Sequence, residues 1–201
     1  MSYDGNMAKS YGEKAYANSF QFKAGVDAAD HEELRDFLYK YSFNLSEAYE
    51  YLRILTQVNE IDSKVKSELF YRIYAMSLQS FALCIRKLTD QPSERSIRKL
   101  IDFAVKPLYA QDHKDQIDEI YKHYKKFLNK FVVHQDVDSI HVGIGYFPDL
   151  NVITKDMAHL REYYLQLTNE ICTKHINVPG KSHDYSSELL KIVIVIVIVI
   201  V

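Results

Sequence analysis

Apolar residues recur every three or four positions through most of this chain, and this spacing restricts the possible fold more than any other feature. Between residues 34 and 55 the apolar stripe consists of Leu34, Phe37, Tyr41, Leu45, Ala48, Leu52 and Leu55. Residues three or four apart lie on the same side of an α-helix, so the stripe predicts one helix of about thirty residues that starts near Asp30. The segment YSFN at 41–44 is a possible break in this helix.

A second long helix is predicted at about 63–88, and it carries two apolar stripes. The first stripe is Phe70, Tyr74, Leu78, Phe81, Ile85 and Leu88, and the second is Val65, Leu69, Ile73 and Met76. A helix that is apolar on two sides is expected to lie between neighbouring helices. We therefore place this helix at the centre of the fold, with Leu78 and Phe81 almost fully buried.

Start and stop signals place the remaining helices. Pro92 and Ser93 are typical of the start of a helix, here a short one that reaches about residue 105, and Pro107 stops it. A long helix is expected at about 112–133. After a loop at 137–153, Thr154 is expected to cap a last long helix.

Composition agrees with an all-α fold. The 201 residues include only six Gly and four Pro, which disfavours a turn-rich β-fold, and 47% of the chain is apolar. Four long helices and one short helix with short connections predict an antiparallel helical bundle. We expect a flexible arm at 1–27, the bundle at 28–178 and a tail at 179–201.

The tail ends in ten alternating Ile and Val residues, 192–201. A membrane-spanning helix needs about 20 residues, and an unpaired strand edge is not tolerated in lipid, so no stable membrane span is expected. Such β-branched alternation favours strand pairing. The segment is either a non-functional extension or a tail for oligomerisation or membrane association.

Other composition features exclude several classes of protein. Cys84 and Cys172 each lie within an apolar helical pattern and are expected to be buried thiols rather than a disulfide, which indicates a reducing compartment. The N-terminal segment lacks the apolar core of a signal peptide, so a cytoplasmic protein is expected.

The histidine spacing predicts no zinc or di-iron site and no glycine-rich phosphate motif is present, so neither a metal nor a cofactor is expected.

The segment YKHYKKFLNK, 121–130, is the most basic stretch of the chain. Lys122, Lys126, Lys130 and His134 recur every four residues, and His123 and Lys125 enlarge the basic surface. This pattern favours either a surface that contacts phosphate groups or a solvated helix end, where cations are stabilised by the helix dipole. Arg86 is likewise either a functional guanidinium or a cation at a helix end.

The order of two segments resembles the HEPN superfamily, and more closely its abortive-infection-U-type branch. In that branch a segment like RKLTDQPSERSIRKLID precedes a segment like KFLNKFVVHQDVD, and the likeness covers about residues 30–176. The resemblance implies a metal-independent endoribonuclease of a defence or toxin–antitoxin system. It also implies a homodimer in which two motifs meet at the seam, and a possible protein partner or antitoxin.

The family signature is an arginine, a polar residue and, a few residues later, a histidine. Asn129 matches the polar residue and His134 the histidine, whereas Leu128 stands where the family has arginine. His134 is then the candidate proton acceptor and Asn129 its orienting neighbour. Lys130 is the expected cation, with Arg86 from a neighbouring helix as the alternative. The RNA-binding cations would be Lys122, Lys125, Lys126 and Arg86. Because leucine cannot stabilise charge on a phosphate, weak or absent cleavage is expected.

Three functions remain open from the sequence. The first is a HEPN-like ribonuclease or a weakened descendant of one. The second is a catalytically inactive helical module that binds RNA or a protein. The third is a helical bundle whose tail drives assembly or membrane association.

Overall fold

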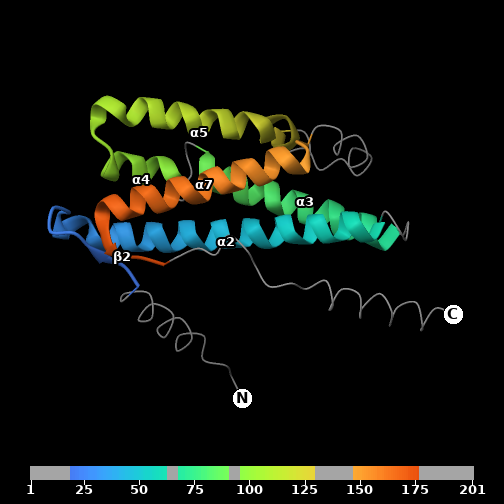
Figure 1. Cartoon of the computed structure of the whole chain (residues 1–201), viewed down its shortest axis with the longest axis horizontal. Coiled ribbons are helices and arrows are strands. Elements are labelled where there is room, and N and C mark those ends of the chain that lie inside the picture. Colours follow the sequence, from blue (N-terminus) through green and yellow to red (C-terminus); the bar gives the residue numbers. More distant parts are fainter. Residues whose placement is uncertain (1–18, 63–67, 91–95, 130–146, 177–201) are drawn as a thin grey trace, which may run out of the picture.

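The computed structural model describes residues 19–62, 68–90, 96–129 and 147–176. Helices make up most of these ranges: α2 (His31–Asp62), α3 (Glu68–Thr89), α4 (Ile97–Ala104), α5 (Pro107–Phe127) and α7 (Leu150–Ile171). The 3-10 helix η1 (Ala28–Asp30) precedes α2, and two short strands, β1 (Gln21–Phe22) and β2 (Cys172–Lys174), pair antiparallel. The predicted bundle of four long helices and one short helix is confirmed (Figure 1).

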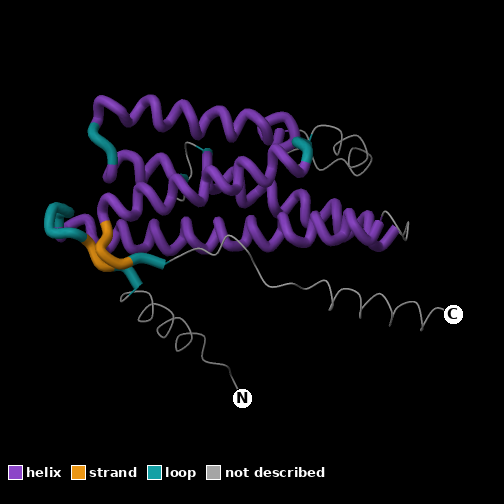
Figure 2. The backbone as a smooth tube through the Cα atoms, in the orientation of Figure 1, coloured by secondary structure: helices purple, strands orange, loops and turns teal. Residues whose placement is uncertain are grey.

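The helices pack around one hydrophobic core. α2 extends along the bundle and packs against α3 and α7, while α5 packs against α3 and α4. Figure 2 shows the strand pair at the end of the bundle where α2 begins and α7 finishes. The end of α5 and the start of α7 lie together at the other end of α7 (Figure 1). This second end carries the candidate site.

Two helix starts differ from the predicted ones. Asp149, and not the predicted Thr154, caps α7, which begins at Leu150. The Asp149 side chain accepts hydrogen bonds from the backbone N–H groups of Asn151 and Val152, at 2.8 and 3.0 Å. Pro107 does more than stop the short helix: it is the first residue of α5, where its missing N–H costs nothing. Pro92 and Ser93 lie outside the described residues.

Residues 19–27 belong to the folded body and not to an arm, which corrects the boundary predicted at residue 27. Phe20 is 1% exposed, and the Lys23 N–H donates to the Ile171 carbonyl at 2.9 Å. A strand of two residues is too short to show a period of two, so the sequence pattern did not reveal it. The earlier part of the predicted arm, 1–18, lies outside the described residues.

The buried residues of α2 and α3 confirm the main predicted apolar stripes. α2 continues without a break through residues 41–44, with Tyr41 and Asn44 both buried. In α3, Leu78 is 2% exposed and Phe81 is fully buried. The prediction of a second buried stripe on α3 is wrong at Met76. This side chain is 68% exposed, because no described helix covers that side of α3.

An aromatic cluster fills the end of the core beneath the candidate site. The ring of Phe81 lies 6.0 Å from that of Tyr124, and Phe147 packs edge-on against Tyr124 and Phe127 at 5.8 and 4.7 Å between centroids. Such edge-to-face pairs add to the stabilisation from burial alone. The cluster joins α3, α5 and the segment that leads into α7.

Both cysteines are buried and free, as predicted. Burial raises the pKa of each thiol, Cys84 and Cys172, from 9.0 to about 11. No helix within the described ranges has the length and apolarity needed to cross a membrane. The Ile/Val tail at 192–201 lies outside these ranges.

Removing the buried Phe81 ring should destabilise the fold strongly. We expect Phe81→Ala to lower the free energy of unfolding by about 3–5 kcal/mol, because the change leaves a cavity inside the aromatic cluster. Denaturant unfolding measures this difference. The matched control is Met76→Ala on the exposed side of the same helix, which should change stability by less than about 0.5 kcal/mol. Equal effects of the two changes would contradict the packing of α3.

Candidate functional site

The last two turns of α5 carry a basic surface, formed by Lys122, Lys125 and Lys126. All three side chains are exposed, whereas Tyr124 and Phe127 on the other side of the helix are buried. Lys122 donates to a Glu119 carboxylate oxygen at 2.5 Å, and this hydrogen bond raises the pKa of Lys122. Among the described residues, Lys125 and Lys126 make no ion pair. The predicted basic surface therefore faces solvent.

The structure includes only part of the predicted catalytic motif. Asn129 is exposed, while Lys130 and His134 lie outside the described residues. Leu128 is 1% exposed and belongs to the hydrophobic core with Tyr124 and Phe127. An arginine at position 128 would place an unpaired guanidinium in that core and cost several kcal/mol. For this reason Leu128→Arg is a poor test of the family motif in this chain.

Arg86 has the geometry of a cation at a helix end. Its Nε lies 3.1 Å from an Asp90 carboxylate oxygen, and its side chain is 43% exposed. Its charge also reaches Tyr121 of α5, where it partly opposes the increase in the tyrosine pKa that burial causes. The pairing with Asp90 favours the structural role of Arg86 over phosphate binding.

A buried carboxylate joins α7 to α5 next to the basic surface. Asp156 is 5% exposed, and one of its oxygens accepts a hydrogen bond from the Tyr124 hydroxyl at 2.9 Å. The same oxygen lies 2.9 Å from Nδ1 of His123. Burial, together with the charge of Asp156, raises the pKa of Tyr124 far above its ordinary value, so the phenol stays a hydrogen-bond donor. The His123 ring is therefore the second contact of this carboxylate, and it carries a positive charge only when it is protonated.

The contact with Asp156 fixes the orientation of the His123 ring. With Nδ1 directed at the carboxylate, Nε2 lies on the opposite edge of the imidazole. The His123 side chain is 43% exposed although its partner is buried. His123 is thus an imidazole held on one side by a carboxylate and open to solvent on the other, an arrangement suited to proton transfer.

A groove of about 440 Å³ lies between α5 and α7 at this point. It is lined by Gln116, Glu119, Ile120 and His123 from α5 and by Val152, Lys155, Asp156 and His159 from α7. Its size falls within the range of about 300–1,000 Å³ that is usual for small-molecule sites. The described part of the chain contains no cluster of three or more side chains able to hold a metal ion.

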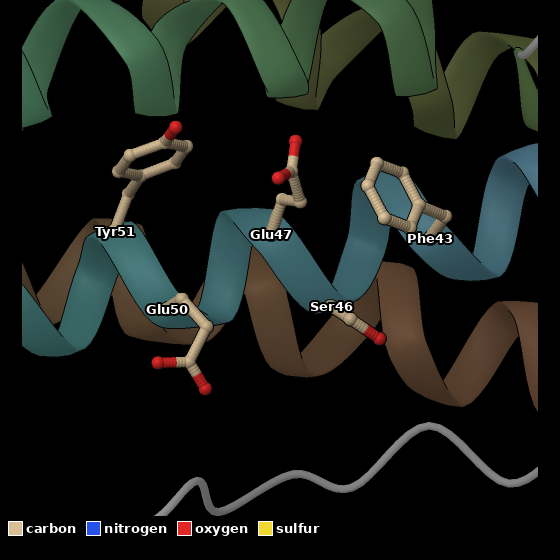
Figure 3. A pocket seen from close by; sticks show the side chains of 5 residues that line it. All are labelled: Phe43, Ser46, Glu47, Glu50 and Tyr51. Carbon is tan, nitrogen blue, oxygen red and sulfur yellow. The ribbon is translucent and has the colours of Figure 1, made fainter. Parts of the chain in front are cut away.

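A second hollow, of about 240 Å³, lies along α2. Figure 3 shows Phe43, Glu47 and Tyr51 on one side of this helix and Ser46 and Glu50 on another. Glu50 is paired with Arg53, at 2.6 Å. Two carboxylates without a histidine or a cysteine offer little for phosphate binding or proton transfer, so the α5–α7 groove is the stronger site.

Sequence reasoning placed His123 only in the basic surface and missed Asp156 and Tyr124. Asp156 lies beside Met157 and one turn after Ile153, on the buried side of α7. A carboxylate on the apolar side of a helix requires a buried partner. The position of Asp156 in the apolar pattern could therefore have indicated a buried polar site. The partners are 32 and 33 residues away, so spacing along the chain did not identify them.

The hydrogen bond from Tyr124 should contribute measurably to stability. We expect Tyr124→Phe to lower the free energy of unfolding by about 1.5–3 kcal/mol, because the buried Asp156 charge loses its buried donor. The matched control is Tyr163→Phe, since the Tyr163 hydroxyl is buried without a hydrogen-bond partner among the described residues. That change should be neutral or slightly stabilising. Denaturant unfolding that finds both variants alike would show that Asp156 does not depend on Tyr124.

Comparisons with known proteins leave the site geometry as the main guide to function. No family model, curated protein or solved structure matches this chain. The resemblance to HEPN proteins therefore rests only on the two sequence segments at 86–102 and 126–138, the second of which contains Asn129 and His134.

Proposed function

We propose that this protein is a HEPN-like, RNA-binding protein of a defence or toxin–antitoxin system that cleaves RNA weakly and without a metal ion in the cytoplasm. The observation that carries the proposal is the position of the exposed basic surface of α5 beside a groove that contains two imidazoles. Lysines attract the phosphate backbone, and imidazoles can move the protons that cleavage requires. Both features lie where α5 finishes and α7 begins (Figure 1).

The basic surface supports RNA as the ligand. Lys125 and Lys126 have no carboxylate partner among the described residues, so their charge is available to phosphate groups. The net charge of the chain is −2, so attraction to RNA must come from a local surface of this kind. Tyr109, which is 54% exposed, lies near the start of α5 and away from these lysines, and Tyr121 beside them is half-buried. Backbone contact rather than base recognition is the expected mode.

The buried Leu128 supports weak cleavage. Metal-free cleavage of RNA needs a proton acceptor near the 2′-hydroxyl and a cation that stabilises the charge of the phosphorane. A core leucine supplies no such cation, and losing one transition-state donor typically costs about 10²–10³-fold in rate. The same observation favours a second candidate function, an RNA-binding module without activity.

The proposal includes a homodimer through the surface that carries Asn129. Asn129 is exposed at the end of α5, and the resemblance implies that two such motifs meet at a dimer seam. Sedimentation that finds only monomer at micromolar concentrations would contradict this part. An antitoxin or other protein partner remains part of the proposal through the resemblance alone.

RNA affinity should depend on the end of α5. We expect Lys125→Gln with Lys126→Gln to weaken binding of single-stranded RNA several-fold. The slope of log affinity against log salt should fall by about 0.7 for each lost phosphate contact. Fluorescence anisotropy at several salt concentrations measures both quantities. The matched control is Lys106→Gln, an exposed lysine at the opposite end of the same helix, which should leave the affinity and the slope unchanged.

RNA cleavage by the unmodified chain should be slow and independent of metal ions. We expect the rate to be the same with and without EDTA, because the resemblance implies cleavage without a metal ion, with imidazoles moving the protons. The measurement is a time course on labelled single-stranded RNA. Activity that disappears with EDTA would contradict the mechanism, and binding without any cleavage would favour the inactive module.

A further inference from the structure

We infer that the α5–α7 groove is the site at which RNA is cleaved, with His123 as proton acceptor and His159 as proton donor. The inference rests on the proposed function and gives it a location. The family resemblance assigns proton transfer to His134, so this is a different site on the same chain. The substrate class is a single-stranded RNA phosphodiester with a free 2′-hydroxyl.

The groove brings the two imidazoles together from different helices. His123 reaches it from α5, where it contacts Asp156, and His159 lies one turn beyond Asp156 on α7. Residues three apart on a helix have Cβ atoms about 5–6 Å from each other, so His159 lies close to the Asp156–His123 pair. His159 also packs edge-on against the Tyr163 ring, at 6.1 Å, which restricts its orientation.

The exposure of its side chain indicates that His123 does more than satisfy the buried Asp156. Tyr124 already supplies a buried donor to the carboxylate, and its ring lies inside the core. A second partner with only a structural role would be expected to be buried as well, yet the His123 side chain is 43% exposed and lines the groove. The buried carboxylate therefore holds an imidazole whose other nitrogen, Nε2, is left for a ligand. Asp156 acts here as a positioning residue.

Nε2 of neutral His123 accepts the proton of the 2′-hydroxyl, and the 2′-oxygen attacks phosphorus. The bond from phosphorus to the 5′-oxygen breaks, and this oxygen takes a proton from the His159 imidazolium. The products are a 2′,3′-cyclic phosphate and a 5′-hydroxyl, and the two histidines then exchange protons with water.

Lys155 supplies the cation that Leu128 does not. It is exposed, lines the groove beside Asp156 and makes no ion pair among the described residues. An ammonium group there can stabilise the additional negative charge of the phosphorane, although without the bidentate geometry of arginine. The nearby Glu119 is held by Lys122, which limits its repulsion of phosphate. Slow cleavage is consistent with this single flexible cation.

The test compares glutamine variants of three histidines with His134→Ala in EDTA. Glutamine at position 123 can still donate a hydrogen bond to Asp156, so His123→Gln should fold, and unfolding curves check this. We expect His123→Gln and His159→Gln each to lower kcat about 100-fold or more. The matched control is His175→Gln. His175 contacts Asn169 outside the groove, so this change should leave the rate unchanged.

Each outcome decides between the two sites. Cleavage that survives in His123→Gln and His159→Gln but is lost in His134→Ala would overturn the inference and leave the proposed function in place. Cleavage products with 5′-phosphate ends would also overturn it. If the unmodified chain binds RNA but does not cleave it, both the inference and the cleavage part of the proposed function fail, and the rate of the unmodified chain alone reveals this. Loss in the two groove variants, with 5′-hydroxyl products and an unaffected His134→Ala, supports the groove.

Discussion

The buried charge of Asp156 determines how the functional end of this bundle is arranged. A carboxylate that is 5% exposed requires partners, and it finds them in the Tyr124 hydroxyl and the His123 imidazole of another helix. These two contacts join α7 to α5. The groove between the two helices and the orientation of His123 depend on this connection.

Much of the fold was predictable because the long helices repeat a simple pattern. The stripe from Leu34 to Leu55 and the stripe through Leu78 and Phe81 identified α2 and α3, whose main apolar sides are buried. The differences lie where local chemistry overrides the pattern. Asp149 caps α7 five residues before Thr154, and Phe20 is buried beside a two-residue strand that has no period to detect. Met76 fits an apolar stripe but has no described helix to cover it.

The candidate site was less predictable because it depends on contacts between distant residues. Consecutive lysines near the end of α5 predicted a solvent-facing basic surface, and the exposed side chains of Lys125 and Lys126 agree with it. The Asp156–His123 pair spans 33 residues and two helices, so only the tertiary structure brings it together. The motif that contains Asn129 and His134 was a prediction from resemblance, and the described residues include only its beginning.

The burial of Leu128 restricts how any phosphate chemistry can occur in this chain. A HEPN-type site requires a guanidinium at that point, but position 128 is part of the same core that supports Tyr124 and therefore Asp156. Placing a charge there would disturb the carboxylate that orients His123. An arginine of the family type at position 128 would thus destabilise this end of the bundle. A cation on the exposed side of α7, such as Lys155, avoids that conflict, because it stabilises phosphate charge without entering the core.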